Sequence, residues 1–524
     1  MLETARATRG MVTAPHRLAA DAGLDVLKAG GNAVEAAVAA AAMIAVCYPH
    51  MNGIGGDGFW LVAEPGKEPV GIDASGRAGA AVDLGLYAGM DEIPQRGPLA
   101  ANTVAGAVSG WEAVLERFGA GRSLAMLLER AIAQAESGMV VPRNYSDLLT
   151  LRRSILEHQP GFKAQWIPDG EVPAEGALLK LPALAQTLRL LVRDGLSGFY
   201  RGELARAIAA DLQAAGSPIT ADDLARHEAV EVKPLSIDLQ PAHVFNLPPP
   251  TQGLASLIIL GLYEALGAPE PDGYDFIHGL VEATKQAFLV RDAQCSDPGD
   301  VTVDLQSFMT NDVLREMRAR IDRERALPWP QRPAGGDTIW LGVIDGNGLA
   351  VSYIQSLFFE FGSGVTLPET GILWQNRGSS FRLDPRARNR VGPGRKTFHT
   401  LNPALARFRD GRTMSYGTMG GEGQPQTQAA IFARYAYHGV PLQRAISAPR
   451  WLLGRTWGET SLTLKLESGF DERVLDQLGE TGHPIEVLDG LSGAMGHAGA
   501  IVRRPDGMLE GATDPRSDGG VAGY

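Results

Sequence analysis

The feature that most constrains this chain is a pair of apolar runs on either side of a turn signal. Residues 335–337 are Gly-Gly-Asp, and Thr338 then opens a run at 338–345 that is rich in β-branched and aromatic side chains. Asn347-Gly348, a strong hairpin signal, precedes a second run at 349–353. The pattern predicts a β-hairpin with Thr338 at the leading edge of its first strand.

A threonine at the start of a strand has two interpretations. In the first it is a β-former that packs in a sheet. In the second, Thr338 is a nucleophile that is exposed when the chain cuts its own preceding peptide bond. Its free α-amino group, with a pKa of about 8, would then be the base that activates the hydroxyl. This second interpretation requires an accessible segment before the threonine, donors for an oxyanion and charged groups that hold a substrate.

The segment before Thr338 differs from the rest of the chain. Residues 310–336 are rich in charge and proline, with a basic and acidic run at 318–325 and prolines at 328, 330 and 333. The composition predicts a surface linker over 322–337 that ends at Asp337-Thr338. The accessible segment is therefore expected to be present.

Helices and strands are both expected on each side of this linker. Helical spacing and an Asn32/Glu35 capping box predict helices at 16–30 and 33–46. Further helices are expected at 109–119, 124–137, 181–194, 203–215, 221–227, 254–267, 274–291, 424–437 and 471–480. Strands are expected at 230–239, 402–409, 414–423 and 462–466, and the mixture indicates α+β layers in one continuous body.

Composition excludes several classes of protein. The 524 residues carry a net charge of −12, which disfavours binding to nucleic acid or to an anionic membrane. The two cysteines, Cys47 and Cys295, lie far apart and form no metal or redox motif. The N-terminus has no basic and apolar signal sequence, and no apolar run is long enough to span a bilayer. We therefore expect a cytoplasmic protein.

Two kinds of loop offer the remaining chemistry. The glycine-rich stretch 416–423 precedes a predicted helix, so its N–H groups are candidate oxyanion donors or simply a tight turn. Arg77 and Arg377 stand beside glycine turns and are candidates to bind a carboxylate, although loop arginines are often only solvated. The sequence contains no GxSxG elbow, HExxH motif or defensible pair of acids.

Nine stretches and the tail of the chain together resemble the γ-glutamyltransferase family of N-terminal nucleophile hydrolases. They occur in that family's order and cover nearly the whole chain. In chain order they are residues 28–38, 53–59, 247–250, 338–356, 361–364, 371–373, 419–421, 448–450 and 511–517, with the tail 523–524.

The resemblance implies an αββα four-layer sandwich and a precursor that cleaves itself between Asp337 and Thr338. The products would be a large segment, 1–337, and a small segment, 338–524, that remain one globular body. Thr338 matches the family's nucleophile, and Ser356 stands where a second threonine hydroxyl usually contacts it. Gly420 and Gly421 match the pair that forms the oxyanion hole.

The expected substrate pocket departs from the family pattern. His399 and Thr400 replace paired serines that contact the substrate carboxylate. Phe358 and Ser380 replace an asparagine and an aspartate that hold the γ-glutamyl amino group, and an ammonium ion without a carboxylate partner in a closed pocket is costly. The family's substrate arginine falls at Ser75, with Arg77 two residues later. These variants resemble the branch that contains oxamate amidohydrolase.

The sequence thus predicts a self-processing threonine amide hydrolase that acts on a small carboxylate-bearing amide and needs no metal or organic cofactor. The alternatives are glutathione hydrolysis or γ-glutamyl transfer, and a non-catalytic protein that binds a small anion. The expected partners are the small-molecule substrate and the chain's own two fragments. A homodimer of two processed heterodimers is an assembly compatible with these expectations.

Overall fold

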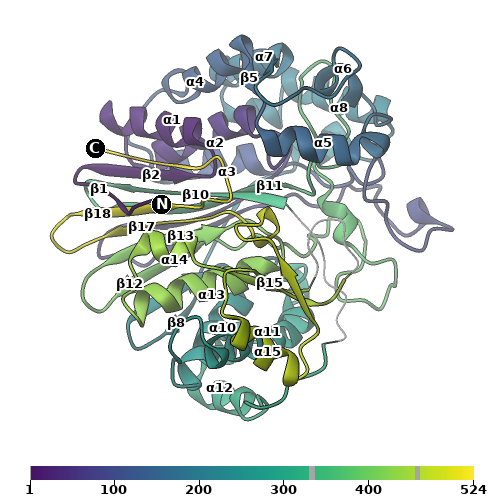
Figure 1. Cartoon of the computed structure of the whole chain (residues 1–524). Helices are drawn as coiled ribbons and strands as arrows, with labels where there is room; N and C mark the ends of the chain where they lie inside the picture. The colour runs from purple at the N-terminus through teal and green to yellow at the C-terminus, as the bar shows by residue number, and fades with distance from the viewer. Residues whose placement is uncertain (1, 330–336, 455–460) are drawn as a thin grey trace.

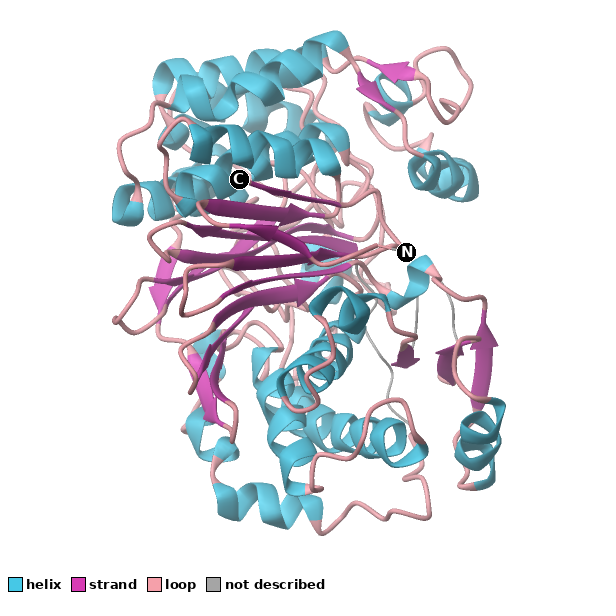
Figure 2. Cartoon of the chain, turned by 60° about the vertical axis from the view of Figure 1, so that its left-hand side comes forward, coloured by secondary structure: helices cyan, strands magenta, loops and turns pink. Residues whose placement is uncertain are grey.

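Two seven-stranded sheets lie face to face at the centre of the molecule, and helices cover the outer face of each (Figure 1). The computed structural model describes residues 2–329, 337–454 and 461–524. Figure 2 shows the same layers from another side, with the strands stacked between two groups of helices. The arrangement is the four-layer αββα sandwich, and the predicted fold class is confirmed.

The first sheet contains the predicted hairpin. Its strands, in spatial order, are β19 (Gly520–Gly523), β2 (Gly10–Ala14), β10 (Asp337–Asp345), β11 (Ala350–Phe358), β3 (Asp57–Ala63), β4 (Val70–Ala74) and β7 (Val230–Val232). β10 and β11 pair antiparallel, with Gly348 at φ +89° in the connecting turn. Thr338 is the second residue of β10, so the prediction for this stretch is confirmed.

The second sheet also combines strands that precede Thr338 in sequence with strands that follow it. Its order is β1 (Ala5–Ala7), β18 (Leu509–Thr513), β17 (Ala498–Arg503), β13 (Thr413–Thr418), β12 (Ala404–Phe408), β9 (Ala242–Asn246) and β8 (Leu235–Asp238). In both sheets, strands that follow Thr338 in sequence lie between strands that precede it. The segments 1–337 and 338–524 therefore share each sheet.

One helical layer covers the first sheet. It contains α1 (Arg17–Lys28), α2 (Ala33–Cys47), α3 (Ala107–Phe118), α4 (Leu124–Ser137), α5 (Arg143–Leu156), α6 (Phe162–Trp166), α7 (Pro182–Asp194) and α8 (Glu203–Ala215) (Figure 1). Every residue of α2 is buried, and its small side chains let the helix approach β10 and β11 closely. The predicted capping box is present, since Asn32 and Glu35 each accept a hydrogen bond from the other's N–H group.

The other helical layer covers the second sheet. It contains α10 (Gly253–Ala265), α11 (Tyr274–Gln294), α12 (Asn311–Arg318), α13 (Gly423–Ala436), α14 (Leu442–Ser447) and α15 (Glu472–Glu480) (Figure 1). A small sheet of β14 (Trp451–Leu453), β15 (Leu464–Glu467) and β16 (Ile485–Leu488) packs beside it. Within the described residues, no helix has the length and apolar character needed to cross a membrane.

One local prediction is wrong. The single strand expected at 230–239 is two strands, β7 and β8, in different sheets, because the chain turns at Pro234, which has no N–H to donate. The charged and proline-rich stretch 310–336 begins with a helix, since Asn311–Arg318 form α12 ahead of the linker expected over 322–337. Residues 322–327 are held against the body, where Tyr274 Oη donates to the Arg323 carbonyl at 2.8 Å. Residues 330–336 lie outside the described part of the chain.

Candidate active site

Thr338 lies at an irregular point of the first sheet. Across the β10–β11 pair, Asp337 faces Phe358 and Ile339 faces Gln355, so a β-bulge lies between Asp337 and Ile339. Such bulges change the direction of a side chain. The Thr338 side chain is fully buried, and its Oγ1 donates a hydrogen bond of 3.3 Å to Ser356 Oγ.

Ser356 connects the threonine to the next turn of the chain. Its Oγ also accepts a hydrogen bond of 2.8 Å from the Phe358 N–H. Phe358 has φ +83°, a conformation that side chains other than glycine adopt rarely, so this hydrogen bond fixes a strained residue. Across the sheet Ser356 pairs with Asp57 at the start of β3. The serine therefore lies between the candidate nucleophile and two other residues of the site.

The predicted oxyanion turn follows β13 directly. Gly420 and Gly421 have φ of +120° and +54°, and α13 begins two residues later. Within the described residues, neither amide donates a hydrogen bond. Two free N–H groups in front of a helix N-terminus form a suitable site for a negative charge.

Packing between the two sheets brings this turn toward Thr338. A Cβ atom built on Gly417 would lie 2.3 Å from Trp340 Cδ1, and one built on Gly342 would lie 3.0 Å from Ser415 Oγ. β10 and β13 thus face one another and run in opposite directions. The start of β10, which carries Thr338, therefore lies toward the end of β13, where the glycine turn begins.

Arg377 is a buried cation that makes no hydrogen bond within the described part of the chain. It begins a short 3₁₀ helix, Arg377–Ser380, and its exposed fraction is 0%. None of its three guanidinium nitrogens has a hydrogen-bond partner among the described residues, and Cζ lies 4.0 Å from the centre of the Phe358 ring. Burial lowers the pKa of Arg377 to about 9, opposed by the charge of Asp57. A buried, unpaired guanidinium is costly, so the geometry indicates a site for an anion.

Asp57 is the acidic group whose charge acts on this arginine, and no site role was assigned to it from the sequence. Its Oδ1 accepts hydrogen bonds from the Gly76 N–H at 2.9 Å, the Gly106 N–H at 3.1 Å and Gln375 Nε2 at 3.1 Å. Its Oδ2 lies 3.4 Å from His399 Nε2. Burial raises the pKa of Asp57 to about 6, although its hydrogen bonds and the charge of Arg377 oppose that rise. The only sequence signal was an acid inside the glycine run 53–58.

His399 and Thr400 line the same buried region. Among the described residues, the two ring nitrogens of His399 and the hydroxyl of Thr400 have no hydrogen-bond partner. Burial, with the nearby charges of Arg377 and Lys396, holds the pKa of His399 well below its ordinary value, so the ring is neutral. Gln252 Nε2 donates to the carbonyls of Thr400 at 2.7 Å and Gly421 at 2.8 Å, which joins this loop to the glycine turn.

The two arginines expected to bind substrate have different environments. Arg77 is exposed, donates to the Gly394 carbonyl at 3.0 Å and lines a surface pocket with Arg226 and Lys396. The structure does not bring it into the buried group around Arg377. Ser380 ends the 3₁₀ helix that Arg377 begins. Its buried Oγ has no hydrogen-bond partner among the described residues.

A group of metal-capable side chains lies elsewhere in the described part of the chain. The ligand atoms of His278, Glu282 and His483 lie within 4.8 Å of one another, and all three residues are buried. Glu282 already pairs with Lys285 Nζ at 2.6 Å and accepts from the Leu327 N–H. His278 Nδ1 lies 2.9 Å from His483 Nε2, and His278 Nε2 lies 2.7 Å from the Asp322 carbonyl oxygen, so these side chains already bond to one another and to the chain. We therefore assign the group to holding residues 322–327 in place.

The comparisons with known proteins decide the family. Residues 19–524 match the family described as Gamma-glutamyltranspeptidase. The chain belongs to the gamma-glutamyltranspeptidase family. It is 54% identical to the oxamate amidohydrolase proenzyme of Klebsiella pneumoniae, over 99% of each chain. It is 41% identical to a glutathione hydrolase-like proenzyme of Bacillus subtilis, over 98% of each chain.

Solved structures place this gamma-glutamyltranspeptidase family member in the same fold. The cephalosporin acylase from Bacillus halodurans matches with a TM-score of 0.90 and 35% identity, over 100% of this chain and 97% of that one. The family and fold inferred from sequence motifs are therefore confirmed, and the chain is a self-processing hydrolase of the N-terminal nucleophile class.

Proposed function

We propose that this enzyme hydrolyses the amide of a small carboxylate-bearing acid such as oxamate. The observation that carries the proposal is the unpaired, fully buried guanidinium of Arg377. A planar guanidinium binds a carboxylate through two parallel hydrogen bonds, which would supply the missing partners. The 54% identity to an oxamate amidohydrolase proenzyme supports the same substrate class.

Arg377 is linked to the nucleophile by a short series of contacts. It packs on the Phe358 ring, the Phe358 N–H donates to Ser356 Oγ, and Ser356 Oγ accepts from Thr338 Oγ1. A carboxylate bound at Arg377 would therefore lie close to the threonine. In oxamate the carboxylate is attached directly to the amide carbon, so a short substrate can contact both groups.

The reaction begins with a cut between Asp337 and Thr338, which frees the α-amino group of Thr338. This amine takes the proton of the Thr338 hydroxyl as Oγ1 attacks the amide carbon. The N–H groups of Gly420 and Gly421 hold the resulting oxyanion. The C–N bond then breaks, the amine returns the proton, and ammonia leaves. Water, deprotonated by the same amine, hydrolyses the ester and releases the diacid.

A γ-glutamyl substrate is the second candidate, because a glutathione hydrolase-like proenzyme is 41% identical to this chain. Its α-amino group would need a carboxylate partner in the pocket. Phe358 and Ser380, which stand where the family holds that group, offer none. The nearby carboxylate of Asp57 interacts with Arg377 and His399, and the buried cation Arg377 would repel an ammonium ion. These charges favour the small acid amide.

Several finer features of the enzyme stay predictions. We propose that the mature enzyme consists of residues 1–337 and 338–524, that it is cytoplasmic, and that two processed heterodimers form a homodimer. Sedimentation of the purified protein tests the assembly, and cell fractionation tests the location.

One set of measurements tests the proposed function. The purified protein should give two bands on a denaturing gel, with an N-terminal sequence that starts at Thr338. Oxamate should release ammonia, whereas a γ-glutamyl anilide should be a poor substrate. Thr338→Ala should give one band and no turnover. Strong turnover of the anilide would favour the second candidate, and full activity of Thr338→Ala would support a different active site.

A further inference from the structure

The glycine turn at 420–421 is supported from behind by a second loop. A Cβ atom built on Gly420 would lie 3.3 Å from Gly496 Cα, and one built on Gly496 would lie 2.2 Å from the Met419 carbonyl oxygen. The Met419 N–H donates to the His497 carbonyl at 3.1 Å. The turn and residues 495–497 are therefore in direct backbone contact, and a shift of one displaces the other.

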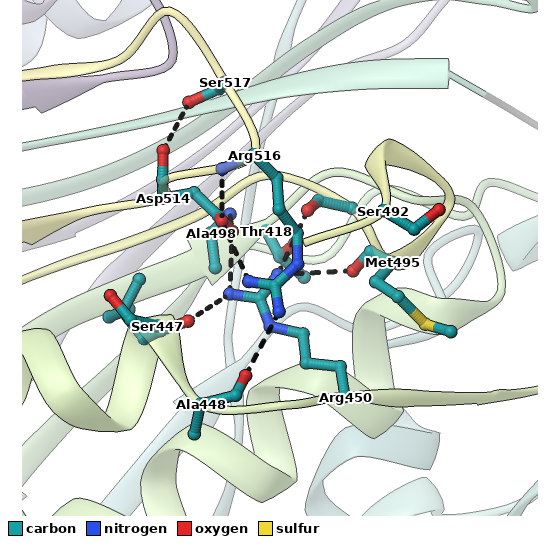
Figure 3. Close-up of polar contacts among 12 residues, drawn as sticks. Thr418, Ser447, Ala448, Arg450, Ser492, Met495, Ala498, Asp514, Arg516 and Ser517 are labelled. Atoms are coloured by element: carbon teal, nitrogen blue, oxygen red, sulfur yellow. Dashed lines mark hydrogen bonds and ion pairs between the residues drawn. The ribbon is translucent and has the colours of Figure 1, made fainter. Parts of the chain in front are cut away.

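Arg450 holds this second loop. Its Nη1 donates to the carbonyls of Met495 at 3.3 Å and Gly496 at 3.0 Å, and its Nη2 pairs with Asp514 Oδ2 at 2.7 Å (Figure 3). Asp514 Oδ2 also accepts from the Ala498 N–H at 2.6 Å. The loop is thus bound at both of its ends by one buried ion pair.

A second ion pair completes the network. Arg516 Nη1 lies 3.1 Å from Asp514 Oδ1 (Figure 3). Arg516 Nε donates to Glu467 Oε1 at 2.8 Å. Glu467 in turn accepts from the Arg450 and Ser492 N–H groups. Arg450 is 1% exposed, and burial lowers its pKa to about 10, with Asp514 acting in the opposite direction. Breaking such a buried pair is costly, so the network is rigid.

We propose that Arg450 is a positioning residue that sets the oxyanion turn of this enzyme through the loop 495–497. The inference rests on the proposed function, in which the Gly420 and Gly421 amides hold the oxyanion. Arg450 touches no substrate. Its planar fork reaches two successive carbonyls and a carboxylate at once, which an ammonium group cannot reproduce. The motifs Ala448-Pro449-Arg450 and Thr513-Asp514-Pro515-Arg516 therefore act together to hold the loop 495–497.

Arg450→Lys tests the proposal, because it keeps the charge beside Asp514 and loses the fork. We expect kcat for oxamate to fall at least about 10-fold, since loss of one oxyanion donor costs about 10²- to 10³-fold. KM should stay within about twofold, because Arg377 is untouched. Hydrogen exchange of the peptide spanning 417–424 should become faster, while exchange in α10 stays unchanged.

Two further variants make the test specific. Arg434→Lys is the matched control, since Arg434 is fully buried, pairs with Asp272 and donates to the neighbouring Pro449 carbonyl. It should leave kcat within about twofold. Gly496→Ala is an independent route to the same effect, because its new methyl group would press on the Met419 carbonyl. It should lower kcat as Arg450→Lys does, even if the lysine variant folds poorly.

The outcomes separate this inference from the proposed function. Unchanged exchange at 417–424 in folded Arg450→Lys overturns the positioning role and leaves the proposed function intact. Faster exchange with unchanged kcat overturns the catalytic half of the inference and leaves the proposed function intact. A loss of kcat in Gly496→Ala with KM preserved supports both.

Discussion

Arg377 stacks its guanidinium on the ring of Phe358, with Cζ 4.0 Å from the ring centre, and the charge of Asp57 offsets another part of the cost of its burial. A cation over an aromatic ring gains about 0.5–2 kcal/mol, less than the cost of burying an unpaired charge. The charge of Arg377 is therefore compensated fully only when an anion binds, so this pocket suits a carboxylate and not an ammonium group.

Replacement of Arg377 should abolish recognition of the carboxylate. We expect Arg377→Met to lower kcat/KM for oxamate about 10²- to 10³-fold, since removing one partner of a buried charge pair costs about 2–5 kcal/mol. Steady-state ammonia release measures it. The exposed Arg386→Met, which loses only a surface pair with Asp384, is the control. Arg77→Met should have an effect at least about tenfold smaller than Arg377→Met, and the reverse order would contradict our placement of the anion.

Removal of Ser356, the hydrogen-bond partner of the proposed nucleophile Thr338, should slow the reaction without preventing binding. In Ser356→Ala both the Thr338 hydroxyl and the Phe358 N–H lose a contact. We expect kcat to fall about 10-fold, consistent with a loss of one buried hydrogen bond of about 1–1.5 kcal/mol. Ser356→Thr keeps the hydroxyl and should retain kcat within about threefold. Equal losses in both variants would indicate that packing at this position, and not the hydroxyl, matters.

The two glycines of the turn should differ in their tolerance of a side chain. Gly420 has φ +120°, which alanine avoids, whereas Gly421 has φ +54°, a region that other residues visit at modest cost. Gly420→Ala should therefore reduce kcat about 10²- to 10³-fold, and Gly421→Ala clearly less. Single-turnover measurement of ester formation at Thr338 checks this order. An equal effect of the two changes would argue against a backbone cause.

Asp57 should make the stability of the fold depend on pH. Its pKa rises from 3.8 in the ordinary state to about 6 in the folded protein. The native state therefore binds this proton more tightly than the unfolded state between these values, so the free energy of unfolding falls as the pH rises through this window. The contribution of this one group is about 3 kcal/mol, at 1.36 kcal/mol per pKa unit.

Asp57→Asn isolates that contribution, because an amide oxygen can still accept from the Gly76 and Gly106 N–H groups. The unfolding free energy of Asp57→Asn relative to that of the parent should increase by about 2.4 kcal/mol from pH 4 to pH 7, because the unfolded carboxyl is already partly ionised at pH 4. Urea denaturation in an uncut Thr338→Ala background keeps the transition unimolecular. A difference that is constant with pH would show that Asp57 titrates near its ordinary value.

Local signals in the sequence predicted the elements around the nucleophile well. The turn at Asn347-Gly348 and the capping box at Asn32 depend on neighbouring residues, so they can be read from the chain directly. The four-layer arrangement was predicted instead from the family resemblance, and the order of the strands was not predicted. The broken strand at Pro234 was missed because its two halves join different sheets, a choice made by tertiary packing.

The chemical character of the pocket was harder to predict. Arg77 and Arg377 both stand beside glycine turns, and only the folded structure shows that one is exposed and the other fully buried. Asp57 gained its role from partners 19 to 342 positions away, Gly76 and His399 among them. Burial and distant neighbours set a pKa, and neither is visible in a local pattern.

The interleaving of early and late strands in both sheets has a consequence for the processed enzyme. β10 and β11 lie between β2 and β3, and β12, β13, β17 and β18 lie between β1 and β9. After a cut before Thr338, neither product can leave without opening both sheets. When differently labelled molecules are mixed, they should exchange their fragments only at the rate of global unfolding. The cell would therefore degrade the two chains together.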